Sequence, residues 1–121
     1  MKVLFVDDDP ASRRLIQKGL AADGINIELA EDGPSAIGII KKVKYDAIVL
    51  DIMMPGVDGL QVGKSARGDS VNNDTPIILL TAHPFALREK AAKRLQPAAS
   101  LSKPIKLDRL AKVIKEAVSK K

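Results

Sequence analysis

The sequence has no cysteine and no tryptophan, and its only aromatic residues are Phe5, Tyr45 and Phe85. Without cysteine the chain can form neither a disulfide framework nor a thiolate metal site. Long apolar runs are also missing, because the first apolar segment, residues 3–6, is followed at once by three aspartates. A secretory signal needs roughly 7–15 apolar residues and a membrane span about 20. We therefore expect a cytoplasmic protein that makes no membrane contact.

The composition that is present is typical of a soluble globular domain. The chain of 121 residues is 45% hydrophobic and 29% charged, which suits one core and is too short for two domains. We expect residues 1–121 to form a single domain. Residues 103–121 contain seven Lys or Arg and two acidic residues, so this last segment supplies the whole net charge of +5.

Short apolar runs alternate with amphipathic segments along the chain. Residues 47–50 and 76–80 are uninterrupted apolar runs, typical of strands buried on both faces of a parallel sheet. Residues 25–29 alternate between apolar and polar, which is typical of an edge strand. The expected strands are residues 3–6, 25–30, 47–50, 76–80 and 98–102. The first expected helix runs from residue 10 to a left-handed cap at Gly24. The other expected helices are residues 35–42, 60–66, 84–96 and 107–118. The alternation predicts an α/β fold of the flavodoxin-like (βα)5 type, a five-stranded parallel sheet of order 2-1-3-4-5 with helices on both faces.

Local signals refine the helices. Asp9 precedes Pro10, so we predict that it is an N-cap and not a third metal ligand. Asp58 precedes the helix expected over 60–66, and we expect it to be another cap or a turn residue. Gly63 interrupts the latter helix, and an interior glycine costs about 0.5–1 kcal/mol relative to alanine. We therefore expect that helix to be less stable than the others.

Four of the five expected strands end on chemically capable residues. The first ends on Asp7 and Asp8, the third on Asp51, the fourth on Thr81 and the fifth on Lys103. Because the carboxyl ends of parallel strands share one edge of the sheet, these side chains should line one cleft. Packed carboxylates repel one another, and a hard divalent cation such as Mg²⁺ relieves that repulsion. A hydroxyl and an ammonium group suit phosphoryl oxygens, so the pattern predicts a carboxylate that accepts phosphoryl with the help of a metal.

These segments together resemble the response-regulator receiver domain of two-component signalling. The resemblance is carried by Val6-Asp7-Asp8-Asp9, by Asp51-Ile52-Met53-Met54-Pro55-Gly56-Val57-Asp58-Gly59, by Thr81-Ala82 and by Lys103-Pro104, and it runs from Lys2 to about residue 119. It implies that Asp51 is the phosphoacceptor. It further implies that Mg²⁺ is held by Asp7, Asp8, Asp51 and the backbone carbonyl of Met53.

The same resemblance implies that Thr81 and Lys103 contact the phosphoryl oxygens and that Lys103-Pro104 is a cis peptide. The protein would then be a signalling phosphoacceptor and not a turnover enzyme, catalysing only its own phosphotransfer and slow autodephosphorylation. Its phosphodonor would be a phosphohistidine on a sensor histidine kinase or phosphotransfer protein. As a stand-alone receiver, its output would be contact with a target protein, or a phosphorylation-dependent dimer, through the face made by the fourth helix, fifth strand and fifth helix. The alternative is that the chain is a receiver excised from a longer protein.

One position departs from the family pattern. Family members couple the threonine to an aromatic side chain on the fifth strand, and here that position is Ser100. Phe85 is the aromatic residue that we consider as a substitute. The single histidine, His83, is expected to lie exposed in a loop. The sharper alternative is that it orients the water that hydrolyses phospho-Asp51.

Other functions are weighed against the same residues. A haloacid-dehalogenase-type phosphohydrolase needs a second aspartate two residues after its nucleophile, where this chain has Met53. A nucleotide binder needs a glycine-rich phosphate loop with lysine, which is absent. The basic last helix has no interleaved aromatic residue, which argues against nucleic acid. A degenerate or scaffold receiver that binds partners without phosphorylation is the remaining alternative.

Overall fold

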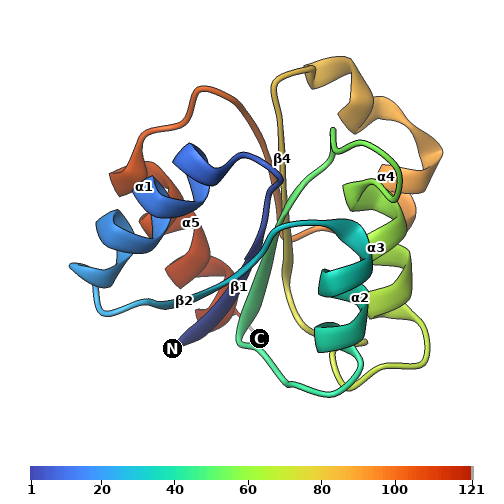
Figure 1. The fold of residues 1–121 in the computed structure, drawn as a ribbon, viewed down its shortest axis with the longest axis horizontal. Helices are drawn as coiled ribbons and strands as arrows, with labels where there is room; N and C mark the ends of the chain where they lie inside the picture. The colour runs from blue at the N-terminus through green and yellow to red at the C-terminus, as the bar shows by residue number, and fades with distance from the viewer. Residues whose placement is uncertain (121) are drawn as a thin grey trace.

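The computed structural model describes residues 1–120, except for the side chain of Phe85. A central sheet is covered by helices on both faces, giving three layers (Figure 1). The strands are β1 (Lys2–Val6), β2 (Asn26–Ala30), β3 (Ala47–Asp51), β4 (Ile77–Thr81) and β5 (Ala99–Ser102). The helices are α1 (Pro10–Ala21), α2 (Gly33–Ile40), α3 (Gly59–Arg67), the 3-10 helix η1 (Pro84–Arg88), α4 (Lys90–Arg94) and α5 (Leu107–Ser119). None of the helices in this part of the chain is both long and apolar enough to cross a membrane.

All five strands are parallel and lie in the order β2-β1-β3-β4-β5. This arrangement confirms the predicted flavodoxin-like fold class. The strand with alternating polarity, β2, and the shortest strand, β5, lie at the two edges as expected, while β3, which is apolar up to its last residue Asp51, lies in the middle. The strand boundaries differ from the expected ones by at most one residue at either end.

The two faces of the sheet carry separate hydrophobic cores. Successive side chains of a strand point to opposite faces, so Ala47 and Val49 of β3 pack with α1 and α5, whereas Ile48 and Leu50 pack with α2, α3 and α4. Burial on both sides explains the uninterrupted apolar run. At the strand ends the apolar runs stop, and polar residues take over on the edge where the chain passes into the helices.

The predicted caps are confirmed. Asp9 Oδ1 accepts a hydrogen bond from the Ala11 backbone N–H at 3.0 Å, at the start of α1. Asp58 and Gln61 form a reciprocal capping box on α3, with bonds of 3.0 and 2.9 Å. Gly24, with φ of 75°, follows α1 in the left-handed conformation, which glycine adopts without steric cost.

The prediction of a single helix over residues 84–96 is wrong. The chain forms η1 and then α4, separated at Glu89 by an extended backbone with ψ of 144°. Within this segment Ala91 is exposed, whereas Ala86, Ala92 and Leu95 are buried. Ala86 and Ala92 are six positions apart, a spacing that places them on different sides of a continuous helix. The break turns both toward the core.

Gly63 also differs from expectation, because it lies inside α3 as a buried contact and not as an interruption. A Cβ added there would lie 2.5 Å from Leu95 Cδ1 and 3.3 Å from Leu50 Cδ1. Glycine at this position therefore allows α3 to approach the end of α4 and the sheet closely.

Candidate functional site

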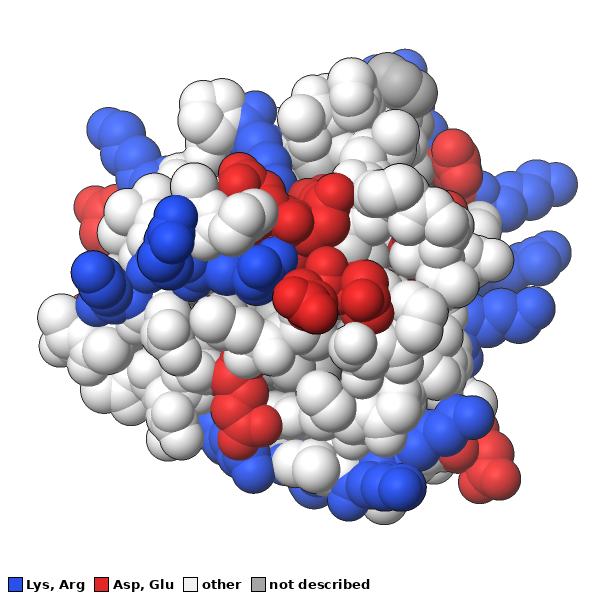
Figure 2. All heavy atoms as spheres, viewed as in Figure 1, with Lys and Arg blue, Asp and Glu red and all other residues white. Residues whose placement is uncertain are grey.

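Three aspartates converge where β1 and β3 end. Asp7 directly follows β1 and is fully buried, Asp51 is the last residue of β3 with 5% exposure, and Asp8 is exposed. One carboxylate oxygen from each of them lies within 4.8 Å of the others. Figure 2 shows acidic side chains gathered near the middle of this face, with Lys and Arg side chains beside them.

Lys103 joins the two buried carboxylates. It directly follows β5, and its Nζ donates to Asp51 Oδ2 at 2.9 Å and to Asp7 Oδ2 at 3.2 Å. The Lys103-Pro104 peptide bond is cis, as the resemblance implied. Residues 7, 51 and 103 are therefore brought into direct contact although more than 40 residues separate each from the next.

Burial and charge act against each other in this group. Burial raises the pKa of Asp51, the neighbouring charge of Asp7 raises it as well, and Lys103 only partly offsets them. Burial acts to lower the pKa of Lys103, but hydrogen bonds and charges from Asp51 and Asp7 outweigh it and raise that pKa. The lysine is thus held protonated between two carboxylates.

Gly59, which the sequence analysis did not single out as a site residue, fixes the backbone of Asp51. A Cβ on Gly59 would overlap the Asp51 carbonyl group, and the Gly59 N–H donates to the Ile52 carbonyl at 3.1 Å. Met53 N–H donates to Asp51 Oδ1 at 3.2 Å, and the Met53 side chain is half exposed at the cleft. The sequence carries no local signal for this close approach, because it depends on how the start of α3 is placed against β3.

Thr81, the last residue of β4, has a buried side chain. Its hydroxyl accepts from the His83 backbone N–H at 3.0 Å and lies 3.4 Å from the His83 carbonyl. The hydroxyl is therefore hydrogen-bonded within the turn that follows β4. Thr81 lies one residue beyond Leu80, the β4 residue that pairs with Asp51. His83 is exposed, as expected.

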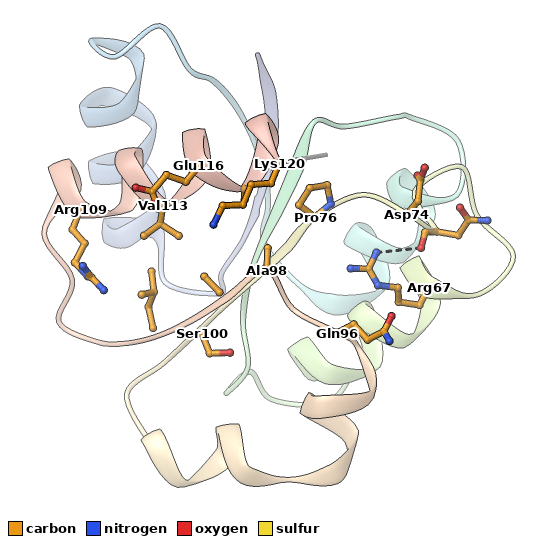
Figure 3. A pocket seen from close by; sticks show the side chains of 14 residues that line it. Arg67, Asp74, Pro76, Gln96, Ala98, Ser100, Arg109, Val113, Glu116 and Lys120 are labelled. Carbon is orange, nitrogen blue, oxygen red and sulfur yellow. Dashed lines mark hydrogen bonds between the residues drawn. The ribbon is translucent and has the colours of Figure 1, made fainter.

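The position that holds Ser100 is exposed on the edge strand β5. Small side chains there leave a groove of about 810 Å³ that lies between β5, α5 and the loop before β4 (Figure 3). Arg67 borders the groove and donates to the carbonyls of Leu95, Asn73 and Thr75 at 2.8, 3.2 and 2.6 Å. The proposed substitute aromatic, Phe85, has a side chain that lies outside the described residues.

A second groove, of about 400 Å³, opens beside the acidic cleft. Asp7 and Lys103 form its polar end, and its remaining wall is mostly apolar. Leu15 of α1 borders this groove and is 61% exposed, the largest exposure among the large hydrophobic side chains described. A macromolecule that reaches Asp51 from this side would contact both the apolar wall and the ion-paired residues.

The donor set of this cleft fits a magnesium ion. Mg²⁺ binds oxygen ligands, is held in phosphoryl-transfer sites by one or two carboxylates, and keeps several waters. Asp7, Asp8 and Asp51 supply carboxylate oxygens only, and the exposed Asp8 leaves the site open on one side. A structural zinc site has four protein ligands, commonly thiolates and imidazoles, and no open position. This cleft has only carboxylate oxygens in its cluster and is open to solvent at Asp8.

Residues 3–115 match the family model described as the response regulator receiver domain. The chain belongs to this family. Receiver domains are signalling phosphoacceptors of two-component systems. Response regulator MprA of Mycobacterium avium is 39% identical over 110 residues, which cover 91% of this chain and 47% of that protein. This chain thus spans about half the length of the curated relatives that it matches.

Two solved receiver structures resemble the fold closely. Response regulator TrrA of Thermotoga maritima, in complex with Mg²⁺ and BeF, superposes with a TM-score of 0.86 at 32% identity, over 96% of this chain and 97% of that one. The receiver domain of sensor histidine kinase PA1611 of Pseudomonas aeruginosa, with magnesium coordinated in its active-site cleft, gives 0.87 at 26% identity, over 98% and 97%.

Proposed function

We propose that Asp51 accepts a phosphoryl group from a phosphohistidine on a sensor histidine kinase or phosphotransfer protein, in the presence of Mg²⁺. The observation that carries this proposal is the contact of one lysine with both buried carboxylates, at 2.9 and 3.2 Å. It places a cation beside the oxygen that would attack. Asp51 lies at the end of a central strand, so its carboxylate faces the cleft while its backbone is held by Gly59.

The residues of the cleft have different roles in phosphoryl transfer. Asp51 supplies the nucleophilic oxygen, and Lys103 balances negative charge on the incoming phosphoryl oxygens. Asp7, Asp8, Asp51 and the backbone carbonyl of Met53 would hold the metal ion. That ion, when bound, neutralises the charge that develops on the phosphoryl group. Thr81 stands at the neighbouring strand end, and its hydroxyl has to leave the His83 backbone to reach the phosphoryl group.

Two surfaces suit the partners. The apolar groove beside the cleft, with Leu15 on its rim, adjoins the acceptor and suits the phosphodonor. The face formed by α4, β5 and α5 suits a downstream target or a second copy. The wide groove along β5, where Ser100 replaces an aromatic side chain, belongs to that face.

Acetyl phosphate with Mg²⁺ tests the proposal without the cognate kinase. Intact-mass measurement should show the addition of one phosphoryl group to the parent protein, and none to Asp51→Asn. Asp46→Asn, which changes an exposed aspartate before β3, is the matched control and should be modified like the parent. If the parent gains no mass with acetyl phosphate or a kinase, the chain is a scaffold receiver that acts without phosphorylation.

A further inference from the structure

Asp7 is hydrogen-bonded through both its backbone and its carboxylate. Its N–H donates to the Ala30 carbonyl of β2 at 3.2 Å. Its Oδ1 accepts from the Asp9 N–H at 3.0 Å, and its Oδ2 accepts from Lys103 at 3.2 Å. The remaining polar atom is the backbone carbonyl oxygen, which lies past the end of β1.

Arg13 of α1 satisfies this carbonyl. Its Nη1 donates to Asp7 O at 2.8 Å, reaching back across six residues from the first turn of the helix. Arg13 is half-buried, whereas the next residue, Arg14, is exposed. A buried carbonyl that lacks a partner is unfavourable, and a charged donor makes a shorter and stronger bond than a neutral one. The guanidinium therefore fixes the peptide plane between Asp7 and Asp8.

That peptide plane belongs to the backbone from which the Asp8 side chain extends. Asp8 is exposed, and no hydrogen bond or ion pair fixes its carboxylate among the described residues 1–120. Its backbone position is the remaining constraint on it. In metal sites, loss of a partner that orients the ligands typically costs about 10–100-fold in metal affinity or activity.

We propose that Arg13 is a positioning residue for the metal site: by binding the Asp7 carbonyl it orients the segment that carries Asp7 and Asp8 for Mg²⁺. This inference rests on the proposed function. It assigns a role to an α1 side chain that makes no hydrogen bond or ion pair with the acceptor aspartate in the described part of the chain. Arg13→Gln removes the charged donor, and Arg13→Lys keeps a positively charged donor group.

Loss of the Arg13 charge and loss of its positioning bond predict opposite changes in Mg²⁺ affinity. Removing a positive charge near a divalent-cation site should tighten Mg²⁺ binding through simple electrostatics. Removing the positioning bond should weaken it. Arg14→Gln deletes the same charge one residue away, from an exposed side chain, and serves as the matched control. The sign of the change therefore separates the two effects.

Calorimetric titration of Mg²⁺ into the unphosphorylated proteins gives the test. We expect Arg13→Gln to weaken Mg²⁺ binding by about tenfold, within the range seen for partners of metal ligands. Arg13→Lys should recover part of that loss, and Arg14→Gln should bind at least as tightly as the parent. With acetyl phosphate, the phosphorylation rate of Arg13→Gln should return toward the parent's rate as Mg²⁺ is raised to saturation.

Three outcomes overturn the inference: equal Mg²⁺ affinity in Arg13→Gln and Arg14→Gln, tighter binding in Arg13→Gln, or a rate deficit that saturating Mg²⁺ leaves unchanged. If Arg13→Gln does not fold, the comparison of Arg13→Lys with Arg14→Lys decides by the same criteria. A parent protein that binds no Mg²⁺ contradicts the proposed function itself and is recognised before any variant is compared.

Discussion

Lys103 is a single cation shared by two buried carboxylates, and the exposed Asp8 adds a third negative group. The cluster therefore keeps an excess of negative charge even with the lysine protonated. Burial raises the pKa of Asp51, and the charge of Asp7 adds to that rise. A divalent cation is the simplest way to balance such a set, so at the scale of residues the donor atoms of the cleft suit Mg²⁺.

Two neighbouring aspartates give a direct test of this arrangement. Mg²⁺ that binds only the folded state should stabilise the parent, by about 2.7 kcal/mol at one hundred times its Kd. We expect Asp8→Asn to lose most of this stabilisation and Asp9→Asn to keep it, because Asp9 caps α1 and asparagine is an equally good cap. Thermal unfolding with and without Mg²⁺ measures the difference. Equal responses in the two variants would contradict the assignment.

The N-cap of α2, Asp32, predicts a pH effect. The Ser35 backbone N–H donates to Asp32 Oδ1 at 2.8 Å and lowers the pKa of Asp32 below its ordinary 3.8. A carboxyl with a lower pKa in the folded state adds stability above its unfolded pKa and loses it as the pH falls through the folded value. The parent should therefore lose stability relative to Asp32→Asn below pH 3.8. Urea midpoints of both proteins across the acid range check this, and parallel curves would refute it.

At the scale of elements, the interior glycines of α2 and α3 have different structural roles. Gly38 lies in α2 with open space where a Cβ would be, whereas Gly63 lies in α3 against Leu95 and Leu50. Sequence alone suggests the same propensity cost at both positions, because it does not reveal which helix face a neighbour covers. For the same reason the sequence predicted one helix over 84–96, although the burial of both Ala86 and Ala92 requires a break.

The two glycines predict opposite mutational effects. Gly38→Ala should stabilise the protein by about 0.5–1 kcal/mol, since alanine is the better helix former. Gly63→Ala should destabilise it by about 1–2 kcal/mol, because overpacking against the buried Leu95 outweighs that gain. Urea unfolding of both variants gives the two free energies. Stabilisation by both would mean that α3 does not pack closely against Leu95.

At the scale of the whole molecule, topology assembles the site. The order β2-β1-β3-β4-β5 places the ends of β1 and β3 side by side, so Asp7 and Asp51 meet without any local sequence signal. The sequence could predict this convergence because parallel strands end on one edge. It could not predict Arg13 or Gly59 as supports, because a contact with a backbone carbonyl depends on how α1 and α3 are placed.

The most direct measurement locates the phosphoryl group. Borohydride reduces an aspartyl phosphate to homoserine, and peptide mapping then identifies the residue. After treatment with acetyl phosphate and Mg²⁺, the account predicts homoserine at position 51 and at none of the other acidic residues among the 15 in the chain. Homoserine at another aspartate, or at position 51 without any dependence on Mg²⁺, would contradict it.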